Sequence, residues 1–307
     1  MMKMKSGKFL SKYLPLTLLA APGLLYLIIN NYIPIFGLFI AFKDYDFSLG
    51  IFNSPWCGLE NFEYLFKTPD AFIITRNTIL YNTGFIILNN LVAVSVAIAL
   101  SEVKKKFLQR TYQVVFLLPN LISMVVVAYI VFAFLSTDTG FLNKWLLPLL
   151  GQSPKAWYTD PGYWPWILNI VNIWKGFGLF STIYFASVIS IPPDLYEAAL
   201  LDGANKWQQI KSITLPILKP TIIMMVLMAI GRIFFSDFGL FYQVPMDKGA
   251  LYPATNVIDT YVYRGLMQLG DIGMSSAAGF YQSVVGFALV LISNLLVRKI
   301  DKESALF

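Results

Sequence analysis

Long apolar blocks, separated by shorter polar or mixed segments, dominate the pattern of this chain. A stretch of roughly 20 apolar residues is long enough, as an α-helix, to cross the hydrocarbon core of a bilayer, which is about 30 Å thick. Six such stretches occur, and they are continuous rather than alternating with the period of two that strands show. The predicted spans are Leu14–Phe42, Arg76–Ser101, Tyr112–Leu135, Pro165–Ile191, Thr221–Tyr242 and Ser276–Val297.

The composition supports a membrane protein. Apolar residues make up 57% of the 307 residues, charged residues 13%, and the mean hydropathy is +0.64. Soluble domains are nearer 45–50% apolar and about 25% charged. The sequence therefore predicts an all-α, polytopic membrane protein with six transmembrane helices, and not the two soluble domains that this length would otherwise suggest.

The first apolar run follows a basic segment, as the core of a secretory signal peptide does. However, the run continues well past Ala21, and no A-x-A cleavage pattern follows it. We therefore expect a retained transmembrane helix. Pro15, Pro22 and Pro34 are expected to bend this helix or to shorten it.

The positions of the basic residues predict the orientation, because Lys and Arg accumulate in cytoplasmic loops. With the N-terminus inside, fourteen lie in inner segments and six in outer segments, with Arg76 at a boundary. Both termini are therefore predicted to be cytoplasmic. The inner residues are Lys3, Lys5, Lys8, Lys12, Lys104, Lys105, Lys106, Arg110, Lys206, Lys211, Lys219, Arg298, Lys299 and Lys302, and the outer ones are Lys43, Lys67, Lys144, Lys155, Lys248 and Arg264.

Several classes of catalytic chemistry are excluded by the residues that the chain lacks. It has no His, and Cys57 is its only Cys, so it offers neither a Cys/His zinc cluster nor a Cys/His nucleophile pair. Its only Gly-Lys pair is Gly7-Lys8, and Met2 stands where the first Gly of a phosphate-binding loop would be. Any ATP hydrolysis must therefore occur on a separate subunit.

The inner segment between the fourth and fifth spans, about residues 191–220, predicts two short helices. Pro193 suits the first turn of a helix, and Leu195–Asp202 forms an amphipathic stretch with small residues. Gly203 fits the left-handed position that ends a helix. A second helix is predicted over Ala204–Ser212, before Pro216 marks the approach to the fifth span. Such a small-faced pair is suited to close docking onto another protein.

The residues of this segment resemble the EAA signature of the permease subunits of binding-protein-dependent ATP-binding-cassette importers. Glu197-Ala198-Ala199 is followed by three residues and Gly203, then by nine residues, Ile213, one residue and Leu215-Pro216. In that family the segment is the coupling helix, which docks onto the ATPase subunit. The resemblance implies an ATPase-coupling set that comprises Glu197, Ala198, Ala199, Asp202, Gly203, Trp207, Ile213, Leu215 and Pro216.

The resemblance extends over the whole chain, residues 1–307, as a single permease domain with the type I importer fold. Gly231–Pro245 and Val257–Ser283 look like the branch of maltose-type permeases that serves complex oligosaccharides and polysaccharide fragments. The resemblance implies a bacterial plasma-membrane location. It also implies that this chain binds no cofactor, and that ATP and Mg²⁺ bind the ATPase subunit. The implied partners are a second homologous permease, two ATP-binding subunits, an extracellular solute-binding protein, an oligosaccharide and membrane lipid, without nucleic acid.

Three charged residues, Lys175, Arg232 and Asp237, fall inside the predicted spans, where charges are costly and normally face a cavity or pair with one another. A sugar path needs polar groups for hydroxyls and aromatic rings for sugar faces. The alternative is that these charges form ion pairs between helices and that the Asn residues serve helix packing. The candidate path residues are Asn169, Asn172, Trp174, Lys175, Tyr184, Arg232, Asp237, Phe241 and Tyr242.

Three other functions are alternatives to a sugar-importer permease. A stand-alone ion-coupled carrier would use the same three charged residues as coupling groups, but it leaves the EAA segment unexplained. An intramembrane enzyme would need a cluster of acidic residues or His near one interface, and the sequence shows none. A permease of the same family for a non-sugar solute remains an alternative to the oligosaccharide.

Overall fold

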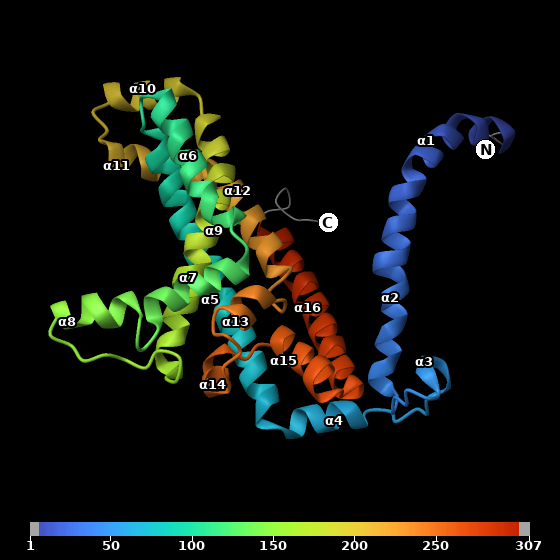
Figure 1. Ribbon diagram of the computed structural model, residues 1–307. Coiled ribbons are helices and arrows are strands. Elements are labelled where there is room, and N and C mark those ends of the chain that lie inside the picture. The colour runs from blue at the N-terminus through green and yellow to red at the C-terminus, as the bar shows by residue number, and fades with distance from the viewer. Residues whose placement is uncertain (1–5, 301–307) are drawn as a thin grey trace.

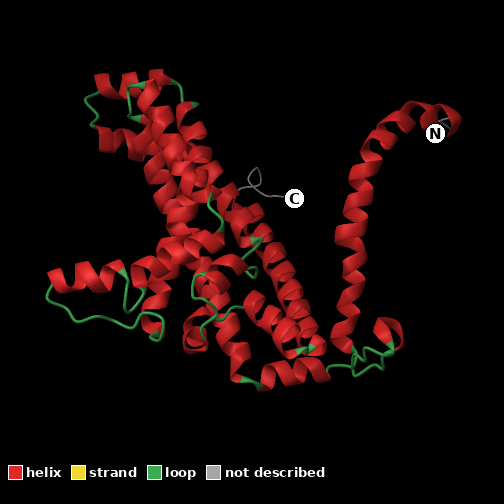
Figure 2. Cartoon of the chain, viewed as in Figure 1, coloured by secondary structure: helices red, strands yellow, loops and turns green. Residues whose placement is uncertain are grey.

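The structure is a computed structural model that describes residues 6–300. Within this range the chain is helical, with turns and loops between the helices (Figures 1 and 2). The described residues form no β-strand, and Lys43 and Trp56 form an isolated β-bridge. The elements are α1 (Ser6–Leu27), η1 (Ile28–Tyr32), α2 (Ile33–Ile35), η2 (Phe36–Phe42), α3 (Gly50–Asn53), α4 (Glu60–Lys67), α5 (Pro69–Ser101), α6 (Lys106–Leu121), α7 (Met124–Leu135), η3 (Leu142–Leu146), α8 (Leu147–Leu149), η4 (Pro161–Tyr163), α9 (Trp164–Ile189), α10 (Pro193–Leu201), α11 (Lys206–Gln209), η5 (Ile210–Thr214), α12 (Leu215–Ile230), α13 (Phe238–Gln243), η6 (Gly249–Leu251), α14 (Tyr252–Thr255), α15 (Ile258–Arg264), η7 (Gly265–Leu269) and α16 (Ile272–Ile300).

Six segments of the described chain are long and apolar enough to cross a membrane, as the sequence predicts. Four are single helical runs, and two more arise if each of two bent helix pairs is taken as one span. The runs are Tyr13–Phe42, Pro69–Ser101, Lys206–Ile230 and Ile272–Lys299, and the bent pairs are Lys106–Leu121 with Met124–Leu135 and Pro161–Ile189 with Pro193–Leu201.

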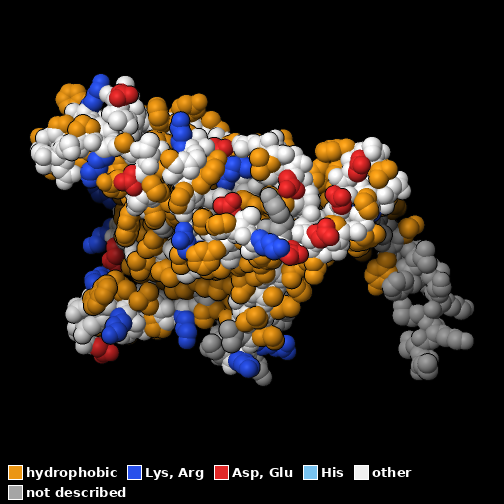
Figure 3. All heavy atoms as spheres, turned by 90° about the horizontal axis from the view of Figure 1, so that it is seen from below, with side chains coloured by type: hydrophobic (Ala, Val, Ile, Leu, Met, Phe, Trp, Pro, Cys, Tyr) orange, Lys and Arg blue, Asp and Glu red, His pale blue; other side chains and the backbone are white. Residues whose placement is uncertain are grey.

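The first span stands apart from the other helices (Figure 1). Only its last part, η2, packs against the bundle: Ala41 is fully buried, and the Phe42 ring contacts the rings of Phe62 and Phe280 at centroid distances of 5.2 and 5.1 Å. The rest of this helix exposes a long series of Leu, Ile and Tyr side chains. Figure 3, a view from below Figure 1, shows hydrophobic side chains over much of the surface, with charged side chains scattered between them.

The centre of the bundle is formed by α5 and α9, with α6 and α12 against them. Gly178 on α9 lies so close to α6 that an added Cβ would sit 1.8 Å from the carbonyl oxygen of Phe116. Small and large residues alternate in the nearby core, where Ala93 and Ala97 on α5 face Tyr184 on α9. Small residues of this kind let two membrane helices approach closely.

Three π-helical turns allow prolines to stay inside helices. A proline ring clashes with the carbonyl group four residues before it, and a wider turn at that carbonyl relieves the clash. In each case the π turn ends two residues before the proline, so the clashing carbonyl belongs to the turn. The pairs are Ile28–Tyr32 with Pro34, Leu142–Leu146 with Pro148, and Ile210–Thr214 with Pro216.

The prediction of one continuous third span is wrong. The helix breaks between α6 and α7, which meet at an angle of 94°. Ile122 and Ser123 take extended backbone angles at the break, and the Ser123 hydroxyl accepts a hydrogen bond from Val126 N–H at the start of α7. The apolar run continues through the break, so hydropathy alone does not reveal it.

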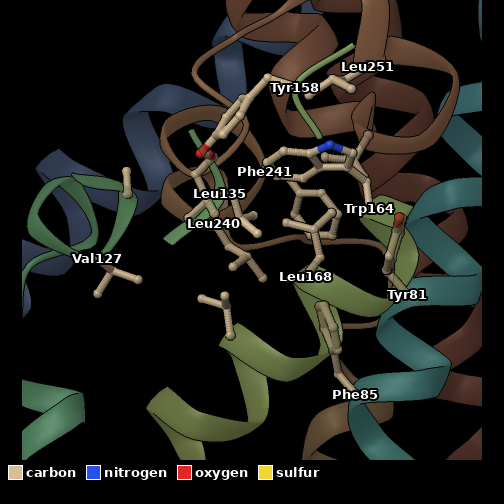
Figure 4. Packing of buried hydrophobic residues seen from close by; sticks show 14 residues of the cluster. Tyr81, Phe85, Val127, Leu135, Tyr158, Trp164, Leu168, Leu240, Phe241 and Leu251 are labelled. Atoms are coloured by element: carbon tan, nitrogen blue, oxygen red, sulfur yellow. Dashed lines mark hydrogen bonds between the residues drawn. The ribbon is translucent and has the colours of Figure 1, made fainter. Parts of the chain in front are cut away.

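A second core cluster closes the end of the bundle opposite α10. It joins side chains of α5, α7, α9 and α13, with Trp164 fully buried and Phe241 1% exposed (Figure 4). The Phe241 ring meets the Tyr81 ring edge-on at 4.9 Å. Phe241 therefore belongs to the hydrophobic core and not to the surface of a path, in contrast to the prediction from sequence.

Candidate functional site

Both predicted ends of the fifth span, Thr221 and Tyr242, are wrong. The helical run covers Lys206–Ile230, so it begins on the inner side with α11 and ends well before Tyr242. Residues 231–237 then form turns and extended backbone before the short helix α13 begins. Arg232 and Asp237 consequently lie in this non-helical connection and not inside a helix. Non-helical backbone at membrane depth is tolerated only where protein buries it or a cavity is lined by it.

Polar side chains from other helices bind the backbone of this connection. On one side Asn82 of α5 donates a hydrogen bond to the carbonyl oxygen of Ile233 at 2.8 Å and another to the Ser236 hydroxyl at 3.2 Å. Phe234, 2% exposed, anchors the middle of the connection in the core. The connection is therefore fixed to α5 rather than left as a free loop.

On the other side, α15 and α16 complete these contacts. Gln282 donates hydrogen bonds to the carbonyl oxygen of Phe234 at 2.6 Å and to the Asp259 carboxylate at 3.1 Å. The second oxygen of Asp259 accepts a hydrogen bond from Ser236 N–H at 2.7 Å. Burial raises the pKa of the Asp259 carboxyl, and the bonds from Ser236 and Gln282 oppose that change. Three elements thus supply the partners that a continuous helix would have supplied itself.

A polar cavity of about 530 Å³ lies beside this connection, between α5, α9 and α12. It is midway along α5 and α9, and therefore deep in the predicted membrane region. Amide, hydroxyl and aromatic side chains share its wall with one cation and one carboxylate. The lining residues are Asn82, Phe85, Ile86, Asn89, Asn90, Asn172, Gly176, Phe180, Met225, Ala229, Arg232, Phe235, Ser236 and Asp237.

The two charged residues of the cavity do not pair with each other. In the described part of the chain, the ion pairs are Lys67–Glu63, Lys206–Glu102 and Arg264–Asp247. Asp237 instead caps α13, where its carboxylate accepts a hydrogen bond from Leu240 N–H at 3.1 Å. The interhelical ion pairs considered for Lys175, Arg232 and Asp237 are therefore absent from residues 6–300.

Lys175 has a structural position at the break of the third span. Its ammonium group donates hydrogen bonds to the carbonyl oxygens of Pro119, Asn120 and Ile122 at 3.4, 3.2 and 2.5 Å. These carbonyls lie at the end of α6, where no following turn supplies N–H groups. A cation is also favoured by the negative end of the helix dipole. Lys175 therefore stabilises the bend and does not line the cavity.

An asparagine seam joins α5 to α9 along the cavity. Asn89 donates a hydrogen bond to the Oδ1 atom of Asn172 at 2.7 Å, and the Tyr184 hydroxyl donates to Asn90 Oδ1. Tyr184 is fully buried, so it positions Asn90 and does not itself line the wall. Asn169 lies further along α9 and donates to the carbonyl oxygen of Pro165. Of the predicted path residues, Asn172, Arg232 and Asp237 line the cavity.

Tyr242 lies just beyond the cavity on α13. Its ring stacks on Phe238 at 4.9 Å and contacts Tyr263 of α15 edge-on at 5.1 Å. This aromatic cluster begins with Phe238, directly after Asp237. Trp174, 38% exposed, lies on α9 away from both the cavity and this cluster.

The coupling segment has the local structure that the sequence predicts. Helix α10 covers Pro193–Leu201, and Gly203 has a left-handed φ of 79°. The N–H of Gly203 bonds to the Leu200 carbonyl at 3.0 Å, and the N–H of Ala204 bonds to the Ala199 carbonyl at 2.9 Å. These two bonds form the Schellman arrangement, which requires the left-handed residue.

The second predicted helix, Ala204–Ser212, is not separate from the fifth span. Asn205 and Gln208 form a reciprocal capping box at its start, and α11, η5 and α12 then continue as one run to Ile230. Lys206 also forms a 2.9 Å ion pair with Glu102 at the inner end of α5. Pro216 lies inside this run because of the π turn before it. The coupling segment therefore enters the fifth span without a flexible joint.

Large apolar side chains of this segment face away from the bundle. Leu201 is 89% exposed and Trp207 is 73% exposed. Glu197, Ala198 and Asp202 are also exposed, while Ala199 is half-buried. Ile213, Leu215 and Pro216 belong to the inner end of the fifth span. Exposed apolar side chains that lie together in this way mark an interaction site.

Sequence analysis missed several cavity residues. Asn82, Asn89 and Asn90 lie seven and eight residues apart in an apolar helix, which is the spacing of one helical face. That signal was present and could have placed them with Asn172. Phe85 and Phe235 carried no such signal, since an aromatic residue in a membrane helix usually packs against lipid or core.

Comparisons with known proteins agree with the EAA resemblance. Residues 89–302 match the family described as "Binding-protein-dependent transport system inner membrane component". Protein LplB of Bacillus subtilis (strain 168) is 33% identical over 94% of this chain and 90% of its own length. The polygalacturonan/rhamnogalacturonan transport system permease protein YteP of the same organism is 32% identical over 95% and 89%.

The fold agrees equally well with solved structures. A chain in the crystal structure of a bacterial ABC transporter involved in the import of the acidic polysaccharide alginate superposes with a TM-score of 0.87 and 31% identity, covering 96% of this chain and 98% of that chain. The predicted all-helical importer-permease fold is thereby confirmed. The chain is a multi-pass inner membrane protein, and it belongs to the family of binding-protein-dependent transport system inner membrane components, the permease subunits of ABC importers.

Proposed function

We propose that this chain, as one transmembrane domain over residues 1–307, forms half of the import path for oligosaccharides or polysaccharide fragments. A second, homologous permease forms the other half. Two ATP-binding subunits dock on the inner side, and an extracellular solute-binding protein delivers the sugar. The names of its relatives support a glycan as cargo, since YteP is a permease for polygalacturonan and rhamnogalacturonan and the solved relative imports alginate.

The polar cavity beside the break of the fifth span carries this proposal. A sugar that enters a membrane must exchange its water for protein hydrogen bonds, and the amide groups of Asn82, Asn89 and Asn172 offer them there. Phe85, Phe180 and Phe235 add the aromatic surface on which the apolar face of a sugar ring rests. A volume of about 530 Å³ is in the range of small-molecule sites.

The coupling segment supplies the connection to ATP. Its exposed apolar side chains and its Gly203 turn form a rigid surface for the ATPase subunit, which binds ATP and Mg²⁺ and hydrolyses the nucleotide. The start of α1 lies at the same end of the molecule as α10, and α16 runs toward that end from the opposite one (Figure 1), which supports cytoplasmic termini. ATPase closure moves this surface and switches the cavity between inward-facing and outward-facing states.

The positions of Lys175 and Asp237 argue against the alternative function, a stand-alone ion-coupled carrier. Its coupling groups would be Lys175, Arg232 and Asp237, but Lys175 binds three carbonyl oxygens and Asp237 caps α13. Two of the three candidate coupling groups therefore hold backbone groups in place. Family membership also explains the EAA segment, which the carrier does not.

Uptake of labelled oligosaccharide into proteoliposomes that contain the complete complex and the binding protein tests the proposal. We expect Asn172→Leu to lower uptake about tenfold or more, because the buried hydrogen bond to Asn89 and one hydroxyl partner are both lost. Asn30→Leu is the matched control, since Asn30 lies on the exposed first span and bonds only to the Tyr26 carbonyl. Equal uptake by both variants would remove the cavity from the path, and uptake of a non-sugar solute alone would assign a different cargo.

A further inference from the structure

Arg232, the cation of the cavity wall, has no partner within the described chain. Arg232 lines the cavity and is exposed to it, and its guanidinium has no hydrogen bond or ion pair with any residue in the range 6–300. An arginine at membrane depth without an anionic partner is energetically unfavourable. Such residues are kept where they bind a ligand or a partner.

Asp237, the other charged residue of the wall, forms no ion pair with Arg232. Its carboxylate instead accepts the N–H of Leu240 at the start of α13. The donors of the Arg232 guanidinium therefore remain available for a ligand. A guanidinium binds carboxylates through two parallel hydrogen bonds, which is the geometry of a sugar carboxylate.

A second polar group of the wall also lacks a partner. The Oδ1 atom of Asn89 is buried and accepts no hydrogen bond in the described structure, although its amide nitrogen binds Asn172. Gly176 places no side chain against this oxygen; an added Cβ there would contact it at 3.6 Å and the Phe180 ring at 3.3 Å. An acceptor of this kind needs a donor such as a hydroxyl group. The cavity thus offers a cation for a carboxylate and an acceptor for a hydroxyl.

We propose that Arg232 and Asn89 form a subsite for a hexuronic acid residue, so that the cargo is an acidic oligosaccharide whose carboxylate binds Arg232. This inference rests on the proposed function and adds the charge of the sugar to it. Arg232 sets the specificity for acidic sugar, and Asn89 binds a hydroxyl that acidic and neutral sugars share. The chemistry is recognition alone, with no bond made or broken.

Equilibrium binding of two probes to the complete complex in nanodiscs, with the solute-binding protein left out, tests this subsite. The probes are trigalacturonate and its methyl ester, which has the same rings without the negative charges. We expect the wild-type complex to bind the acid at least about tenfold more tightly than the ester, because charge-assisted bonds are about twice as strong as neutral ones. Arg232→Gln should remove this difference, and Arg232→Lys should restore part of it.

Two further variants separate the roles. Asn89→Leu should weaken both probes by a similar factor, whereas Lys248→Gln, which removes one exposed positive charge from the outer loop, should change neither. Equal affinity of the wild type for acid and ester, or an equal loss of both in Arg232→Gln, would overturn the inference. Failure of Arg232→Gln to assemble with the second permease, with assembly restored by Arg232→Lys, would assign Arg232 to the subunit interface instead. If the complex binds no trisaccharide at all, including neutral galactotriose, the proposed function itself fails.

Discussion

Gly203 gives the sharpest test of the coupling segment. Its φ of 79° is left-handed, and the space around it is open, since an added Cβ would meet nothing within 4 Å. Gly203→Ala therefore adds backbone strain and no clash. That strain is about 1–2 kcal/mol, which corresponds to roughly a 5- to 30-fold loss of the loop conformation seen here relative to others.

Three substitutions at Gly203 separate strain from docking. Asn tolerates the left-handed region better than Ala, so Gly203→Asn should retain more of the loop conformation. Gly203→Asp has the same shape as Asn but adds a negative charge next to Asp202, on the surface that we propose to dock on the ATPase. We expect Gly203→Asp to abolish ATP-driven uptake and to weaken ATPase co-purification. The uptake and ATPase recovery of Gly203→Ala should lie between those of Gly203→Asp and Gly203→Asn.

The assay is co-purification of the ATPase subunit from detergent, followed by ATP-driven uptake into proteoliposomes. The amount of permease in the membrane is measured for each variant, so that loss of folding is distinguished from loss of docking. Normal uptake and normal ATPase recovery in Gly203→Asp would refute the docking role of this turn.

Two further predictions concern the membrane region. Lys175→Met should destabilise the complex by about 2 kcal/mol, because the carbonyl groups at the end of α6 lose a charged donor, and thermal unfolding in detergent should show a lower Tm than for the control Lys248→Met. Tyr242→Ala should lower uptake while the complex still assembles, since the ring lies in a half-buried aromatic cluster beyond the cavity; unchanged uptake in Tyr242→Ala would exclude this cluster from the path.

The coupling segment could be predicted in detail because its structure is local. Pro193 at the start of α10 and Gly203 after its end act on backbone conformation within a few residues. The apolar runs likewise predicted the six membrane segments, since a span depends on its own length and hydropathy. The EAA spacing then supplied the family, which the comparisons confirmed.

The breaks in the third and fifth spans could not be predicted, because they depend on residues far away in the sequence. Lys175 binds the end of α6 from a position more than 50 residues later, and Asn82 binds the connection after α12 from about 150 residues earlier. An apolar run shows no sign of a partner that lies on another helix. The expectation that Arg232 and Asp237 lie inside a helix was wrong for this reason.

The helical run from Lys206 to Ile230 joins two distant parts of the molecule in a single rod. It starts beside Trp207 and Gly203, on the inner side, and Met225 and Ala229 near its other end form part of the cavity wall. At about 1.5 Å per residue its length is roughly 37 Å, so that a tilt of about 10° around one end shifts the other by about 6 Å. In the proposed import path, a small rotation at the Gly203 end of this rod is therefore enough to displace the cavity wall at the other end by several Å.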